Sequence, residues 1–153
     1  MHFSSCTVLS LYLSHNIIEW MKDPYILEMT ASEPLSLEEE IEMQQSWAID
    51  SKKVTFIVVR PYIDTDNIDA NTDTSKIGSD VMIGDVNLFF NDYDNPTSAE
   101  VDVMIARDDA RGQGMGAEAV RLMLHYALQR LAVTRFYCKI NETNKASLSL
   151  FRK

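Results

Sequence analysis

The sequence predicts a mixed α/β domain, and three observations support this prediction. Two helical segments come first, three apolar strands follow, and the last of these strands begins an alternation of strand, helix, strand and helix. The 153 residues suit one domain with one hydrophobic core, which we expect to span residues 1–153. With 46% hydrophobic and 24% charged residues, the composition is that of an ordinary globular protein.

The first half of the chain is predicted to contain two helices. Residues 16–29 follow a helical pattern that Pro24 must break or restart. Ser36 and Glu39 fit a capping box, in which the serine caps the helix and the glutamate reaches back. Several acidic side chains near the start of this second helix are expected to lie in solvent, close to its positive end: Glu38, Glu39, Glu40 and Glu42.

Apolar runs predict the strands. They cover residues 54–59, 81–90, 99–106 and 134–140, and a short strand is expected at 8–13. Residues 61–78 are polar and predict a loop. A strong helix follows residue 116, and a last helix begins near Asn144.

Charge and cysteine content limit the partners. The net charge of −9 argues against nucleic-acid backbones and anionic membranes, and is compatible with a cationic partner. No apolar run approaches the ~20 residues of a membrane span. Two cysteines, Cys6 and Cys138, provide neither a disulfide framework nor a zinc-ligand set, so we expect no metal and a cytoplasmic or nuclear location. The sequence leaves the oligomeric state open.

A glycine-rich stretch directly before a helix is the most informative feature. It consists of Arg111, Gly112, Gln113, Gly114, Met115 and Gly116. Its unobstructed N–H groups and the positive helix end would form an anion site, to which the Arg111 guanidinium adds charge. Gly112, Gly114 and Ala117 also fit a dinucleotide fingerprint, but too little chain remains for that fold. A nucleotide-binding module stays a weaker alternative.

The strand before this loop carries two acids on one face. Glu100 and Asp102 alternate with valines and share that face with Met104. Because burying two unpaired carboxylates is costly, the face is either open to water or lines a site. A carboxylate in a partly dry cleft gains basicity and can accept a proton from an ammonium group.

These features resemble the GCN5-related N-acetyltransferase (GNAT) family. Arg111–Gly116 matches the family's R/Q-x-x-G-x-G/A loop, with the expected strand before it and helix after it. The tail matches a second family spacing, at Asn144, Ser147, Phe151 and Lys153. Residues 29–35, 84–89 and 100–116 resemble the N-acetyltransferase 9-like branch. The resemblance covers residues 19–153 and implies a central, mostly antiparallel sheet flanked by helices.

The resemblance also implies a reaction, namely acetyl transfer from the co-substrate acetyl-CoA to a primary amine of a protein or peptide. The amides of Gln113–Gly116 would hold the CoA pyrophosphate, and Asn144 would contact CoA. Three strand residues would pair with the pantetheine arm and polarise the acetyl carbonyl: Val103, Met104 and Ile105. Glu100 stands eleven residues before Arg111, where some members carry a general base, and Asp102 is the second candidate.

The sequence departs from the family pattern in three places. Phe151 replaces a tyrosine that often protonates the departing thiolate. Residues 1–15 fit the first family strand poorly, and the sequence ends at Lys153, before the last two family strands. We therefore expect a domain truncated at its C-terminus. The alternative hypothesis is a catalytically impaired fragment that only binds CoA or a partner.

Overall fold

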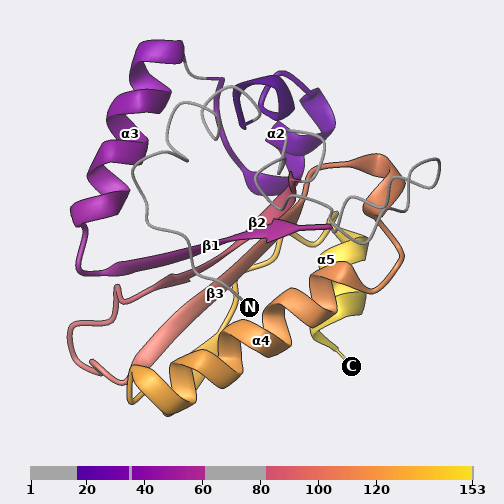
Figure 1. The fold of residues 1–153 in the computed structure, drawn as a ribbon. Helices are drawn as coiled ribbons and strands as arrows, with labels where there is room; N and C mark the ends of the chain where they lie inside the picture. The colour runs from indigo at the N-terminus through magenta and orange to yellow at the C-terminus, as the bar shows by residue number, and fades with distance from the viewer. Residues whose placement is uncertain (1–16, 35, 61–81, 153) are drawn as a thin grey trace, which may run out of the picture.

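The structure, a computed structural model, describes residues 17–34, 36–60 and 82–152 (Figure 1). In chain order its elements are α2 (Pro24–Thr30), α3 (Leu37–Ile49), β1 (Lys53–Val59), β2 (Met82–Phe89), β3 (Ser98–Ile105), a 3-10 turn (Asp108–Ala110), α4 (Met115–Arg130), β4 (Arg135–Tyr137) and α5 (Lys145–Phe151). The predicted mixed α/β layout is confirmed. The strand predicted at 8–13 and the loop predicted at 61–78 lie outside the described residues.

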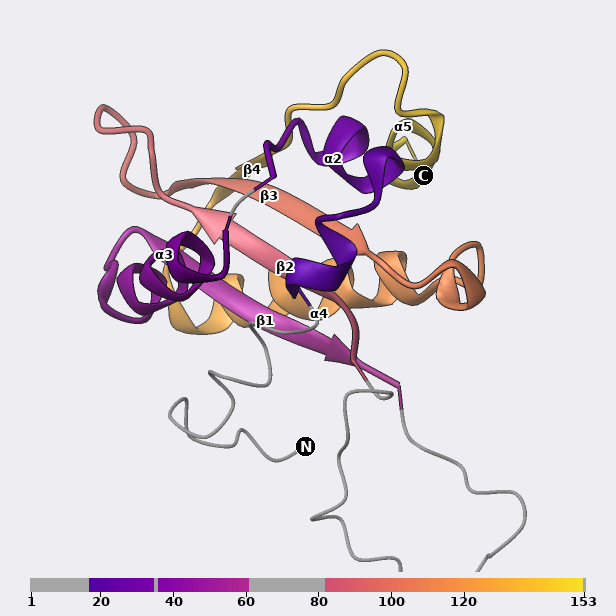
Figure 2. The same ribbon diagram turned by 90° about the horizontal axis from the view of Figure 1, so that it is seen from above.

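The sheet has the strand order β1-β2-β3-β4. The first three strands pair antiparallel, and β4 pairs parallel to β3, so the sheet is mostly antiparallel. Helices α2 and α3 lie over one face of the sheet and α4 lies under the other (Figures 1 and 2). None of the helices in the described ranges combines the length and apolar character needed to cross a membrane.

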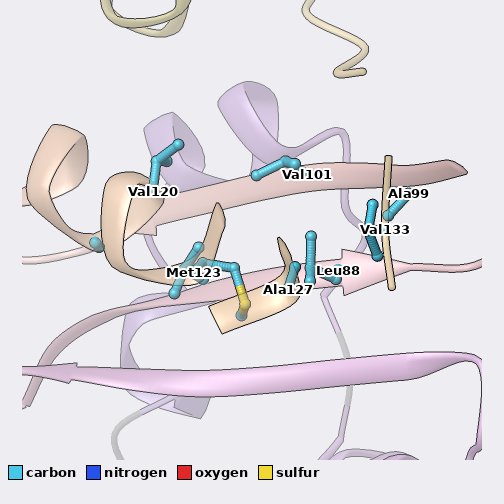
Figure 3. Packing of buried hydrophobic residues seen from close by; sticks show 9 residues of the cluster. Leu88, Ala99, Val101, Val120, Met123, Ala127 and Val133 are labelled. Atoms are coloured by element: carbon cyan, nitrogen blue, oxygen red, sulfur yellow. The ribbon is translucent and has the colours of Figure 1, made fainter. Parts of the chain in front are cut away.

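The hydrophobic core lies between α4 and the sheet. Met123 is fully buried in this helix, and Val120 packs near it (Figure 3). Strand side chains of alternating positions complete the cluster, including Val86, Leu88, Ala99 and Val101. Because side chains alternate between the two faces of a strand, the intervening strand residues face α2 and α3.

The face under α2 and α3 carries many polar side chains, with the apolar Ile57, Phe89 and Met104 among them. It carries Lys53 and Thr55 from β1, Asp85 and Asn87 from β2, and Glu100 and Asp102 from β3. The two acids predicted to share a strand face therefore do so. They continue a row of polar side chains across three strands.

Helix α3 begins as the sequence predicts. The Ser36 hydroxyl accepts a hydrogen bond from the Glu39 N–H (3.3 Å), and the Glu39 carboxylate accepts one from the Ser36 N–H (2.8 Å), so the capping box is confirmed. The prediction that Glu40 lies in solvent is wrong, because this side chain is only 1% exposed. It sits on the side of α3 that packs against β1, within electrostatic range of Lys53 and Asp85.

Strands β2 and β3 approach very closely at Gly84. A Cβ atom at this position would lie 1.9 Å from the carbonyl oxygen of Met104 and 3.0 Å from the Cα of Ile105. Only glycine fits there without moving backbone. Gly84 thus fixes the position of the end of β3, which is the strand that leads into the glycine-rich loop.

Candidate functional site

A cleft of about 410 Å3 opens beside the end of β3. Its walls come from α2, the end of β3, the glycine-rich loop, the segment after β4, and α5. Most residues predicted for the site line it: Asp102, Val103, Met104, Ile105, Arg111, Gly112, Gly114, Met115, Gly116 and Asn144. The structure brings these residues together from three separate segments, although the role of each stays a prediction.

The glycine-rich loop places the start of α4 at this cleft. Gly112 and Gly114 have φ angles of 72° and 87°, the left-handed region that side chains disfavour. Gly114 is the N-cap of α4 and offers no side chain to cap it. The first helical hydrogen bond runs from Glu118 N–H to Gly114 O (3.0 Å), so the amides of residues 115–117 have no carbonyl partner within the helix. These amides and the helix dipole suit an anion.

Arg111 fastens this loop to the end of β3. Its Nε donates to the Ile105 carbonyl (2.8 Å) and an Nη donates to the Ala106 carbonyl (2.7 Å). The guanidinium also pairs with Asp108 and lies 4.8 Å from the ring centre of Tyr25 in α2. Although the sequence indicated a charge for a phosphate, two of the five Arg111 donors hold backbone carbonyls and its Nη1 pairs with Asp108. The arginine thus holds the shape of the cleft that it also lines.

Gln113 lies outside the cleft lining. Its side-chain amide donates to the Asp109 carbonyl, one turn back along the chain. Asp109 itself accepts from Arg60 (2.8 Å) and Arg107 (2.9 Å), and these hydrogen bonds hold the pKa of its carboxyl well below the usual range. The loop is therefore braced by side-chain contacts on the side away from the cleft.

Glu100 is paired rather than open to a substrate. Its Oε2 lies 2.7 Å from Lys139 Nζ, and its side chain is 17% exposed while that of Lys139 is 73% exposed. The contact raises the pKa of Lys139, so the lysine stays charged. Glu100 is absent from the cleft lining, whereas Lys139 contributes to it.

Asp102 lies two residues farther along β3 and does line the cleft. Its side chain reaches solvent, yet enough protein surrounds the carboxyl to raise its pKa, and the charge of Glu100 acts in the same direction. A hydrogen bond from the Val103 backbone opposes this rise. Of the two acids proposed from the sequence, Asp102 therefore combines access to the cleft with increased basicity.

Asn144 joins two walls of the cleft. Its Oδ1 accepts from Ser147 N–H (3.0 Å) and caps α5, while its Nδ2 donates to the Met29 carbonyl at the end of α2 (3.3 Å). Phe151, on the same short helix, also lines the cleft. In its present contacts Asn144 is structural, and only its position beside the cleft agrees with the predicted CoA contact.

Sequence reasoning missed the α2 wall of the cleft. Tyr25, Ile26 and Met29 line it, and so does Cys138 beyond β4. No motif marks these residues, because their place depends on how α2 docks against α5. No three His, Cys, Asp or Glu side chains gather in a metal-binding arrangement within residues 17–34, 36–60 and 82–152.

Comparison with known proteins shows which family this chain resembles. A family model, the acetyltransferase (GNAT) domain, matches residues 13–153. The N-acetyltransferase 9-like protein of Nematostella vectensis is 48% identical over 135 residues, 88% of this chain and 65% of that protein. The human alpha/beta-tubulin-N-acetyltransferase 9 is 43% identical over 135 residues, 88% of this chain and 62% of that protein. The chain thus spans less than two thirds of the length of these curated relatives.

A solved structure supports the fold. The spermidine N-acetyltransferase of Vibrio cholerae, crystallised with CoA and spermine, superposes with a TM-score of 0.69 at 20% identity, covering 91% of this chain and 72% of that chain. At this identity the likeness concerns the fold alone. The family model and the curated relatives carry the assignment: this chain belongs to the GNAT acetyltransferase family and is similar to its N-acetyltransferase 9-like members.

Proposed function

We propose that this chain transfers the acetyl group of acetyl-CoA to a primary amine of a protein or peptide. The observation that carries the proposal is the start of α4, whose free amides open into a cleft that the end of β3 also lines. Family membership supports the same reaction class. Its relatives are N-acetyltransferases by name, which adds to this support.

The cleft has the chemistry that CoA requires. The pyrophosphate would lie against the amides of residues 115–117 at the positive end of α4. This site is local, so it tolerates the acidic net charge of −9. The end of β3, at Val103–Ile105, borders the same cleft and can offer its backbone to the pantetheine arm. When bound, acetyl-CoA supplies the activated acetyl group.

Asp102 is the general base in this proposal, in place of Glu100. It lines the cleft and its pKa is raised, whereas Glu100 is held by Lys139. Asp102 accepts a proton from the acceptor ammonium, and the neutral amine that results is the nucleophile. Phe151 has no proton to give to the leaving group. A thiol with a pKa near ~8.5 can leave as a thiolate without an acid.

The proposed acceptor is a cationic amine. Acidic side chains on the face beside the cleft favour a cationic group, which an α-amino terminus and a lysine both provide. The human relative carries α/β-tubulin in its name. Tubulin is therefore the first protein acceptor to test, alongside N-terminal and lysine peptides derived from it.

The first experiment is calorimetric titration of the purified chain with acetyl-CoA, with desulfo-CoA, ATP and NAD as comparison ligands. Saturable binding that prefers the CoA compounds supports the site. Preference for ATP or NAD would instead favour a nucleotide-binding module. CoA binding without acetyl transfer to any amine would identify a chain that binds CoA but lacks activity.

Three variants then test the base. Asp102→Asn should retain acetyl-CoA binding and lower turnover by about 10²–10⁴-fold, the usual contribution of a positioned base. Glu100→Gln should retain most of the turnover. Asp94→Asn, in an exposed turn, is the matched control and should behave like the wild type. Full activity in Asp102→Asn would refute this assignment.

A further inference from the structure

The cleft begins where strands β3 and β4 stop pairing. Their ladder ends with Glu100 opposite Tyr137. The residues that follow this last pair on both segments line the cleft, namely Val101 and Asp102 on one side and Cys138 and Lys139 on the other. Lys139 is therefore the second residue beyond the point at which the two segments stop pairing.

Lys139 puts an amine into this cleft. Among the described residues that line it, Lys139 is the only lysine. Its side chain is 73% exposed, and its Nζ lies 2.7 Å from Glu100 Oε2 and 5.8 Å from the ring centre of Tyr137. A lysine amine is the same kind of nucleophile as the acceptor of the proposed reaction. The protein itself therefore brings a possible acceptor to the cleft that would hold acetyl-CoA.

Glu100 controls the charge of this amine. Its carboxylate accepts a hydrogen bond from the Lys139 ammonium group, and this bond and the opposite charge raise the pKa of Lys139. The Glu100 side chain is only 17% exposed, whereas that of the lysine extends into solvent. Only a neutral amine attacks a thioester, so a lysine that keeps its proton reacts slowly. The ion pair therefore opposes acetylation of Lys139 without blocking access to it.

We propose that Lys139 is a self-acetylation site, which accepts the acetyl group of acetyl-CoA bound in the same cleft, and that Glu100 slows this modification. In the reaction the Lys139 ammonium group first gives one proton to solvent. The neutral nitrogen attacks the thioester carbonyl, a C–N bond forms, the C–S bond breaks, and CoA leaves as a thiolate that takes up the second proton from the nitrogen. The product is an uncharged N-acetyl-lysine that no longer forms an ion pair with Glu100. This inference rests on the proposed function, since it requires acetyl-CoA in the cleft.

The shared cleft should make Lys139 react faster than other exposed lysines. An amine and a thioester held in one cleft meet within one complex, which raises the rate above that of an encounter in solution. Lys22 is the matched reference, because its side chain is also exposed (64%) and paired with a carboxylate, that of Glu19, but lies outside the cleft lining. We expect Lys139 to be acetylated at least about tenfold faster than Lys22. Removing the charge of Glu100 should raise the rate at Lys139 by a further two- to fivefold or so, about the usual effect of an exposed ion pair.

Mass spectrometry that resolves each lysine tests the proposal. The purified full chain is incubated with isotope-labelled acetyl-CoA, with and without an excess of desulfo-CoA, and the label is quantified at every lysine. Label at Lys139 should exceed that at Lys22, and it should fall when desulfo-CoA occupies the cleft. Its rate per chain should not depend on protein concentration, because donor and acceptor lie in one cleft.

Variants of the two ion pairs test the role of Glu100. Glu100→Gln and Glu100→Asp, which shortens the side chain, should each increase the label at Lys139, whereas the control Glu19→Gln should leave it unchanged. Label at Lys139 that is no greater than at Lys22, that resists desulfo-CoA or whose rate per chain rises in proportion to protein concentration would overturn the self-acetylation site. Unchanged label at Lys139 in both Glu100 variants would overturn the role of Glu100.

Binding and acceptor assays separate this inference from the proposed function. If the chain binds acetyl-CoA and acetylates an external amine but leaves Lys139 unmodified, the self-acetylation site is wrong and the proposed function stands. If Lys139 is modified and no external amine is, the proposed acceptor reaction fails and the self-acetylation site stands. If calorimetry detects no binding of acetyl-CoA, both fail.

Discussion

Gly84→Ala is expected to destabilise the chain at the junction between β2 and β3. The added Cβ would lie 1.9 Å from the Met104 carbonyl oxygen, whereas real Cβ atoms essentially never come closer than 3.0 Å to such a neighbour. The strands must therefore separate by about 1.1 Å at this point, the difference between these two distances. The obstacle is backbone, so no side-chain rotation can relieve it.

The magnitude follows from the hydrogen bonds that this separation stretches. Two or three β2–β3 bonds at about 1 kcal/mol each are weakened, while replacing a flexible glycine recovers roughly 0.5–1 kcal/mol from the unfolded chain. The net loss is about 2 kcal/mol. With a urea m-value near 2 kcal/mol/M for a chain of this size, the unfolding midpoint should fall by about 1 M.

Equilibrium urea unfolding, followed by circular dichroism, measures this shift. Gly116→Ala is the matched control: its Cβ would meet only side-chain atoms, at the end of Leu150 (3.1 Å) and on Ile105 (3.5 Å). The Leu150 side chain can move, and alanine favours the helix. The control should unfold near the wild-type midpoint. A Gly84→Ala midpoint equal to that of the wild type would refute the argument that close strand approach requires glycine here.

Three further substitutions test other contacts. Burial raises the pKa of Asp85 from 3.8 to about 6, so the wild type should lose up to about 3 kcal/mol of unfolding free energy as the pH rises through that range. Asp85→Asn should remove most of this loss. Equal pH slopes of the unfolding free energy in the two proteins would contradict this expectation. Arg111→Lys should cost about 2 kcal/mol in urea unfolding, since an ammonium group cannot keep both hydrogen bonds to strand-end carbonyls; an unchanged midpoint would argue against this anchoring. Ser36→Ala should cost about 1 kcal/mol through loss of the N-cap, whereas Ser46→Ala in the same helix should cost little; equal effects would show that the cap is not responsible.

Local patterns were enough to predict the elements of this fold. Apolar runs marked β1, β2 and β3, and the serine–glutamate spacing marked the start of α3. These signals work because the structure they predict forms within a few residues of the chain. Strand β4 is shorter than predicted, at Arg135–Tyr137, because only these residues pair with β3.

Contacts between distant segments could not be read in this way. Glu40 fits a solvated first turn equally well, and only the packing of α3 against β1 buries it. The pairing of Glu100 with Lys139 joins residues 39 positions apart, and no spacing rule predicts it. The glycine-rich loop was recognisable because all of its donors lie within six residues. The choice between Glu100 and Asp102 depended on such distant contacts and stays a prediction.

The hydrogen bond between Asn144 and the Met29 carbonyl has a consequence for how the protein forms. It joins residues 115 positions apart, so the wall that α2 gives to the cleft closes only after Asn144 has been made. During synthesis α2 leaves the ribosome before α5, and it can contact α5 only after that helix has been made. Tyr25 and Ile26 stay open to other proteins during that interval, which is when chaperones act. Cleft formation therefore reports that α2 and α5 have come together, and a ligand of the cleft would select chains in which they have done so.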